Sequence, residues 1–65
     1  MNQAQKEIYG ELEKTRQAYL KILSICRTER PFNHKNASAL KSEIHCGLRH
    51  MERMQSWISE EQNEA

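Results

Sequence analysis

A single proline divides this chain and limits its fold more than any other feature. Pro31 is the only proline in 65 residues. Proline lacks an amide donor and disfavours helical backbone at the residue before it. A helix is therefore expected to end near Arg30, and Asn36 or Ser38 can cap the next helix with a side-chain oxygen. The turn then covers residues 31–36, a usual length between antiparallel neighbours.

Both arms beside this turn have a helical composition. The chain has no valine and no aspartate, and its nine acidic residues are all glutamate. Good helix formers are thus frequent and poor ones rare. We expect helices over about residues 3–30 and 37–61, followed by a frayed acidic tail over residues 62–65. The sequence predicts an all-α fold in which residues 1–65 form one two-helix antiparallel hairpin.

Apolar residues recur along both arms in a seven-residue repeat, which is typical of paired helices. The first arm carries Ile8, Leu12, Thr15, Tyr19, Ile22 and Cys26, and the second carries Ala37, Leu40, Ile44, Gly47, Met51, Met54 and Ile58. If facing residues have numbers that add to 66, every first-arm position meets a second-arm position, and Tyr19 meets Gly47. A glycine costs about 1 kcal/mol inside a helix. Here it would leave room for the tyrosine ring.

One hairpin leaves apolar residues uncovered. Residues 19–26 are apolar on nearly all sides, and Leu48 and Trp57 lie beside the second repeat. A helix that is apolar on most sides is usually buried on most sides, and a chain this short rarely buries enough surface alone. We therefore expect a homodimer in which two hairpins form a four-helix bundle. The alternative occupant of this surface is a different protein.

Charge is unevenly distributed, although the net charge is only +1. The acidic end, residues 52–65, carries a net charge of −3. The turn region carries a net charge of +3, from Arg27, Arg30, Lys35 and Lys41 against Glu29. These cations could bind phosphate or an acidic protein surface. The simpler interpretation is that they are surface charges solvated by water.

Motifs for catalysis and metal binding are incomplete. Cys46 and His50 lie one helical turn apart, but structural zinc uses four ligands. Cys26 lies too far from Cys46 in the expected register for a shared metal or a disulfide. A catalytic pair of Cys46 and His50 would lack an orienting acid, an oxyanion hole and a pocket. We expect no enzymatic activity, no cofactor and no metal.

The chain has no feature of a membrane or exported protein. No apolar run approaches the roughly 20 residues of a membrane span, and the polar start, residues 1–5, does not look like a signal peptide. Two cysteines do not make a disulfide framework. We expect a cytoplasmic protein that does not contact a membrane.

Two resemblances point to small bacterial or phage proteins. Two amphipathic helices and a tight turn in 65 residues resemble small bacterial dimeric hairpins such as the plasmid copy-number protein Rop, in architecture only. Residues 42–44 (Ser-Glu-Ile), Leu48, Met51 and residues 54–57 (Met-Gln-Ser-Trp) are similar to the helical hairpin of phage and prophage sigma-like positive-control factors. The helix-turn-helix of such factors is absent from this sequence. The resemblance implies a small regulatory protein, and DNA binding does not follow from it.

The sequence thus predicts a regulator or adaptor that binds a protein partner. Buried aromatic side chains are common hot spots, so Phe32 and Trp57 are expected to contribute more to binding than Arg30. The alternative is RNA or DNA held by the basic turn, although its four cations are fewer than the about six to ten phosphate contacts of dedicated binders. The binding candidates are Phe32, Trp57, Leu20, Ile25, Arg27, Arg30, Lys35 and Lys41, with Arg16, Lys21, Arg49 and Arg53 as further cations for a nucleic acid.

Overall fold

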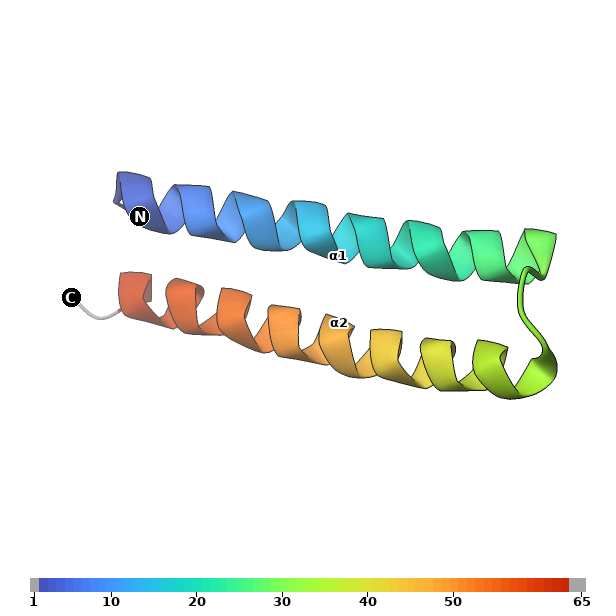
Figure 1. Cartoon of the computed structure of the whole chain (residues 1–65). Helices are drawn as coiled ribbons and strands as arrows, with labels where there is room; N and C mark the ends of the chain where they lie inside the picture. The colour runs from blue at the N-terminus through green and yellow to red at the C-terminus, as the bar shows by residue number, and fades with distance from the viewer. Residues whose placement is uncertain (1, 64–65) are drawn as a thin grey trace.

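The computed structural model describes residues 2–63, which form two long antiparallel helices joined by a short turn (Figure 1). Helix α1 covers Gln3–Glu29 and helix α2 covers His34–Asn63. We call the end with the turn the tip and the opposite end the open end. The hairpin is a rod of 50 × 16 × 13 Å. Its radius of gyration of 15.0 Å exceeds the roughly 11 Å of a compact domain of this length, so much of each helix stays exposed.

The predicted all-α hairpin is confirmed, but α2 begins earlier than predicted. Asn33 caps this helix instead of Asn36 or Ser38. The Asn33 Oδ1 atom accepts a hydrogen bond from the Asn36 amide at 2.8 Å, and the Asn33 carbonyl accepts from the Ala37 amide at 2.9 Å. The turn is therefore residues 30–33 rather than 31–36.

At the open end, α2 continues through residues 62 and 63, where a frayed tail was predicted. The rest of that predicted tail, residues 64–65, lies outside the described residues. The helix therefore extends past the expected end at residue 61, and its last described turn stays alongside the beginning of α1.

Arg30 ends α1 in the left-handed backbone conformation, with φ 49° and ψ 54°. Glycine adopts this conformation freely, whereas other residues lose on the order of 1 kcal/mol. Pro31 follows and cannot continue the helix. The tip thus holds an arginine at a position where glycine would be more stable.

The start of α1 is fixed by a capping box and tied to α2. The Asn2 side chain accepts from the Gln5 amide at 2.7 Å, and the Gln5 side chain accepts from the Asn2 amide at 3.0 Å. Gln5 Nε2 also donates to Glu61 Oε2 at 3.1 Å. The numbers of Gln5 and Glu61 add to 66, the register predicted from the two repeats.

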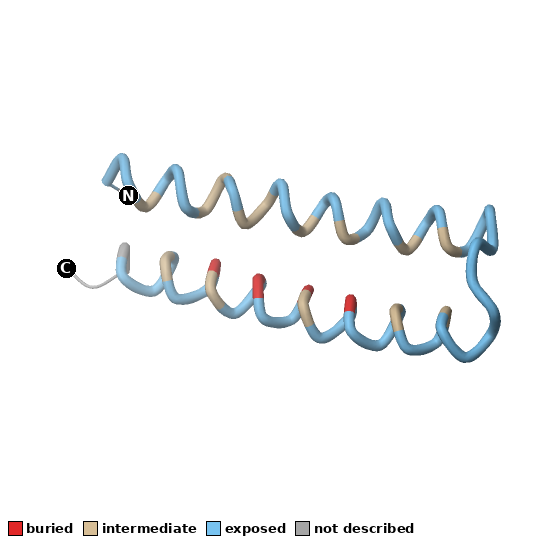
Figure 2. Tube along the Cα trace, viewed as in Figure 1, coloured by how far each residue is buried: buried red, intermediate tan, exposed pale blue. Residues whose placement is uncertain are grey.

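The core lies along the side of α2 that faces α1 (Figure 2). Every position of the repeat predicted for the second arm is buried or half-buried. Leu48 and Gln55, which lie outside that repeat, are buried as well. The buried residues are Ile44, Leu48, Met51 and Gln55, and the half-buried apolar residues around them are Leu12, Tyr19, Leu23, Leu40 and Met54.

The repeat predicted for the first arm is wrong at three of its positions. Ile8 is 54% exposed, Ile22 is 38% exposed, and Thr15 is also exposed. Helix α1 is rotated so that a neighbouring repeat faces α2. Its members, all half-buried, are Gln5, Tyr9, Leu12, Arg16, Tyr19, Leu23 and Cys26.

Polar contacts with α2 accompany the inward placement of this second repeat. Two of its members are polar, and both find partners across the hairpin. Gln5 donates to Glu61, and Arg16 Nη1 lies 3.8 Å from Glu52 Oε1. If the predicted repeat faced α2 instead, Gln5 and Arg16 would lack these partners. The observed rotation therefore places paired polar groups beside α2 and leaves Ile8 and Ile22 exposed.

Tyr19 meets Gly47, as the repeats predicted. A Cβ atom at Gly47 would collide with Tyr19 Cε2 and would lie 3.2 Å from Tyr19 Cδ2. A Cβ atom at Gly10, the other glycine, would have no neighbour within 4 Å. The ring of Tyr19 therefore occupies space that any other residue at position 47 would fill.

Gly47→Ala is expected to lower the free energy of unfolding by about 1–3 kcal/mol, because overpacking outweighs the better helix propensity of alanine. Gly10→Ala is the matched control and should raise the free energy of unfolding by up to about 1 kcal/mol. Urea denaturation followed by far-UV circular dichroism measures both. Equal stabilisation by the two substitutions would show that the Tyr19 contact does not constrain position 47.

Candidate functional site

The largest group of exposed apolar side chains lies on one side of the hairpin. Ile8, Thr15 and Ile22 are seven residues apart and therefore share a side of α1. Ile25 follows Ile22 by about one turn. The exposed fractions of the three isoleucines are between 38% and 54%. This row remains uncovered because α1 turns its other repeat toward α2.

A matching row on α2 lies on the same side. Glu43, His50 and Trp57 are also seven residues apart, and Trp57 is 56% exposed. Ile22 from α1 lines the same hollow as Glu43 and His50 from α2, which places the two rows together. We call this side the groove face; it comprises Ile8, Thr15, Ile22, Ile25, Glu43, Cys46, Gly47, His50 and Trp57.

The hollow in the groove face is about 440 Å³ in volume and lies between the helices. Gly47 and Tyr19 both line it, and the Tyr19 ring occupies the space that a side chain at position 47 would fill. Its walls are mainly apolar, with one acid and one histidine at the rim. The lining residues are Tyr19, Ile22, Leu40, Glu43, Ile44, Cys46, Gly47 and His50.

The opposite side of the hairpin is closed by charged groups. On α1, Glu13 lies nine residues from Ile22 of the groove face, and on α2, Glu52 lies nine residues from Glu43. Nine residues correspond to a rotation of about 180° around a helix, so both glutamates lie on the side opposite the groove face. Arg16 joins these two acids: its Nη2 lies 3.2 Å from Glu13 Oε1 and its Nη1 lies 3.8 Å from Glu52 Oε1. We call this side the polar side.

Gln55 extends this charged cluster into the core. Its side chain is buried, and its Nε2 donates to Glu13 Oε2 at 3.1 Å. Hydrogen bonds from Arg16, Gln55 and Gln17 lower the pKa of Glu13 from 4.5 to about 2. The carboxylate form of Glu13 is therefore part of the folded structure, and it satisfies the buried amide of Gln55.

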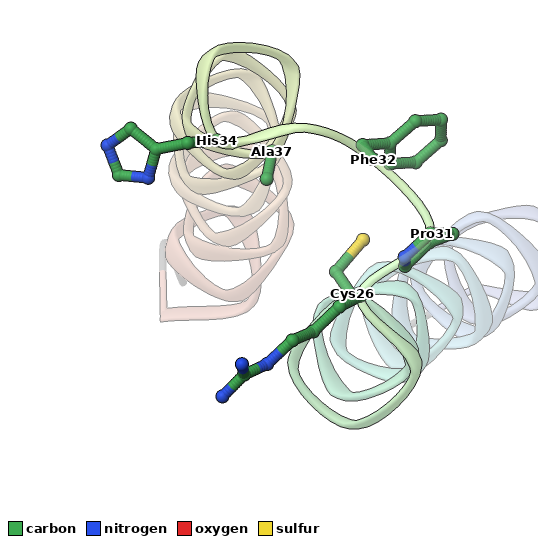
Figure 3. A pocket seen from close by; sticks show the side chains of 6 residues that line it. Cys26, Pro31, Phe32, His34 and Ala37 are labelled. Carbon is green, nitrogen blue, oxygen red and sulfur yellow. The ribbon is translucent and has the colours of Figure 1, made fainter.

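A second hollow, about 330 Å³ in volume, lies at the tip. Figure 3 shows the thiol of Cys26 and the methyl group of Ala37 pointing into the space between the helices. The rings of Phe32 and His34 point away from that space in different directions. Phe32 is 50% exposed. The ring is therefore accessible to another molecule instead of filling the hollow.

The apolar residues that the sequence indicated for binding lie in three places. Ile25 and Trp57 belong to the groove face, and Phe32 lies at the tip. Leu20 lies five residues from Ile25, which places it about 140° away around α1. The structure thus brings Ile25 and Trp57 to one side and separates both from Leu20.

The four cations indicated for binding, Arg27, Arg30, Lys35 and Lys41, all lie near the tip and are exposed. None of them forms an ion pair with another described residue. Exposed and unpaired cations are available to an anionic partner, but their solvation by water is the ordinary state of such groups.

The hollow itself was not indicated by the sequence. Ile8 and Ile22 were assigned to the core because they share a repeat with Leu12 and Tyr19. The signal that could have shown this is the overlapping repeat one position further on, Tyr9, Arg16 and Leu23, which includes a charged residue. Cys46 and His50, which were considered for metal binding, line this hollow.

Comparison of this chain with protein families, curated proteins and solved structures found no significant match. In the part of the chain that the structure describes, no three histidine, cysteine or glutamate side chains gather as they would around a metal ion. No helix among residues 2–63 is long and apolar enough to cross a membrane. Function is therefore inferred from the surface features of the hairpin.

Glu13→Gln is expected to reduce the acid sensitivity of the fold. Folding lowers the pKa of Glu13 from 4.5 to about 2, so its contribution to stability is present above pH 4.5 and is lost as the pH falls toward 2. In the variant, the free energy of unfolding should therefore decrease less between about pH 5 and pH 2. Urea denaturation at several pH values in this range measures the difference.

The control for this experiment is Glu11→Gln. Glu11 pairs with Lys14 at 3.3 Å, but both side chains are more than 70% exposed, and such pairs contribute little. This variant should keep the wild-type pH dependence. An unchanged pH dependence in Glu13→Gln would contradict the role assigned to the Glu13 carboxylate.

Proposed function

We propose that this chain is a cytoplasmic, non-enzymatic regulator or adaptor that acts by binding proteins through its exposed apolar side chains. The observation that carries this proposal is the groove face, where Ile8, Ile22, Ile25 and Trp57 are 38–56% exposed and Ile22 lines a hollow between the helices. Contiguous apolar surface with a polar rim is typical of protein-binding sites. The two cysteines are free thiols, as is usual in a reducing compartment.

Self-association into a four-helix bundle is part of this proposal. Each helix of such a bundle buries two neighbouring faces, one within its own hairpin and one against the other hairpin. Helix α1 offers both, because its inward repeat and the row of Ile8, Thr15 and Ile22 are roughly a quarter of a turn apart. The polar side already pairs its charges and does not need such cover.

The tip supports contact with a different protein. The exposed ring of Phe32 lies at the tip, where Arg30 and Lys35 are close to it in the sequence and are also exposed, so an apolar anchor and cations occur on the same end of the hairpin. Such a surface suits a partner that offers an apolar pocket bordered by acidic residues. Because the tip lies away from most of the groove face, the dimer and the second protein can bind together.

The unpaired cations at the tip favour nucleic acid as the second candidate. Arg27, Arg30, Lys35 and Lys41 would make about four phosphate contacts, and the logarithm of the affinity would then fall by roughly four units per unit of log salt. Protein binding through Phe32 would depend much less on salt. This difference separates the two candidates.

Phe32→Ala is expected to reduce capture of a protein partner from a lysate of the source cells by roughly 10-fold or more, because it removes the anchor of the tip. Arg30→Gly is the matched comparison: it removes a charge, and glycine fits the left-handed conformation at this position. Capture by the Arg30→Gly variant should stay close to that of the wild type. Quantitative mass spectrometry of captured proteins, with and without nuclease, provides the measurement.

The opposite pattern would support the nucleic-acid candidate. In that case nuclease or moderate salt would abolish capture, Arg30→Gly and Lys35→Ala would weaken it strongly, and Phe32→Ala would have little effect. Circular dichroism of each variant shows that the hairpin is intact, so that a loss of capture is not a loss of fold.

A further inference from the structure

We propose that the groove face binds a second copy of this chain, arranged tip to tail, and that Trp57 of each copy covers the part of the hollow near Leu40 and Glu43 in the other. This inference rests on the proposed self-association and adds its surface, its orientation and its anchor. Surface area, symmetry and charge each support it independently.

The hairpin exposes more surface than a folded monomer of its mass. Its accessible surface is 5324 Å², whereas a folded monomer of 7.7 kDa exposes about 4,300 Å² by the usual scaling. The excess of roughly 1,000 Å² is close to the about 800 Å² that each partner contributes to a standard-size interface. Burial of the groove face against one more copy would therefore bring the exposed surface into the usual range.

Two-fold symmetry places Trp57 over the hollow. In a tip-to-tail dimer with full overlap, the symmetry axis passes near residue 49, the midpoint of α2 at His34–Asn63. Trp57 lies eight residues from this midpoint toward the open end, so in the second copy it faces a position eight residues toward the tip, about residue 41. The hollow extends along α2 from Leu40 to His50. A slide of one helical turn in the direction of His50 keeps the indole over it.

The same symmetry brings together the isoleucines of α1. The midpoint of Gln3–Glu29 is residue 16, so Ile8 faces about residue 24 of the second copy, between its Ile22 and Ile25. Thr15 lies close to the axis and meets itself. Its hydroxyl donates to the Glu11 carbonyl at 2.8 Å, so no unsatisfied hydroxyl is brought into the interface.

Charge selects the tip-to-tail orientation over the alternative with both tips at one end. Residues 27–41 at the tip carry a net charge of +3, whereas residues 52–63 and 2–13 at the open end each carry a net charge of −2. Side-by-side tips would bring two basic regions together. Tip-to-tail packing instead sets each basic tip beside the acidic open end of the other copy, and this attraction falls as salt is added.

Ile22→Glu is the first test. The substitution places a carboxylate beside the hollow and should weaken self-affinity by roughly 100-fold or more. Leu20→Glu is the matched control, since Leu20 and Ile22 are 39% and 38% exposed and point about 160° apart on α1. Sedimentation at micromolar concentration should give twice 7.7 kDa for the wild type and for Leu20→Glu, and a monomer for Ile22→Glu.

The fluorescence of Trp57 reports directly on the anchor, because it is the only tryptophan in the chain. The emission of the wild type should shift to shorter wavelength as concentration rises and the dimer forms. The emission of Ile22→Glu should stay at long wavelength at all concentrations. Circular dichroism checks that this variant keeps its helices, and both isoleucine and leucine variants change only exposed positions.

A spin label at position 35 measures the orientation. Lys35→Cys, with Cys26→Ser and Cys46→Ser, carries one label near each tip. Tip-to-tail packing should separate the two labels by about 40 Å, from 28 residues at ~1.5 Å per residue. Tips at the same end would bring the labels within the width of two rods, each 16 × 13 Å in cross-section.

Three results would overturn the inference. If the wild type stays monomeric at high concentration, the groove face does not bind a second copy. A short label distance overturns the orientation, and a dimer that persists in Ile22→Glu or loses stability equally in Leu20→Glu overturns the surface. Capture of a partner through Phe32 is measured separately, so failure of this dimer does not count against binding at the tip.

Discussion

The contact between Tyr19 and Gly47 determines both the register of this hairpin and the shape of its surface. A Cβ atom at position 47 would collide with the ring, so the two helices can approach in this register only because position 47 has no side chain. Both residues also line the hollow in the groove face. A residue that costs stability within α2 therefore allows the close approach of the two helices, and it does so beside the hollow that we propose a second copy covers.

The sequence predicted α2 better than α1, and the reason lies in the number of repeats each arm contains. In α2, every residue of the predicted repeat, from Ala37 to Ile58, is buried or half-buried. In α1, two repeats overlap and share Leu12, Tyr19 and Cys26, and the prediction used only the more apolar one. The partners that Gln5 and Arg16 find on α2 distinguish them, and pairing across the hairpin is not visible in one arm alone.

The tip was predicted in outline because proline alone is enough to end a helix. Its details were not, because residues 33–38 contain several side chains that can cap a helix, and their choice depends on backbone geometry. Asn33 serves as the cap, and Arg30 takes the left-handed conformation without being a glycine. For the candidate site, the sequence indicated Trp57, Ile25 and Phe32 by residue type, but their division between the groove face and the tip required the fold.

The rotation of α1 links the stability of the hairpin to its proposed binding. Turning Arg16 toward α2 places it 3.8 Å from Glu52 on the polar side while it keeps its pair with Glu13 on its own helix, and the same rotation moves Ile8 and Ile22 out of the core. Ion pairs at a partly exposed site contribute little on their own, whereas two isoleucines left in water lose a hydrophobic contribution of several kcal/mol, at about 1.5–3 kcal/mol for each buried side chain. The rotated arrangement is thus favourable as a whole when the isoleucines are covered, which is what the proposed docking at the groove face would provide. In this view the polar side aligns the hairpin, and the partner supplies the missing part of its core.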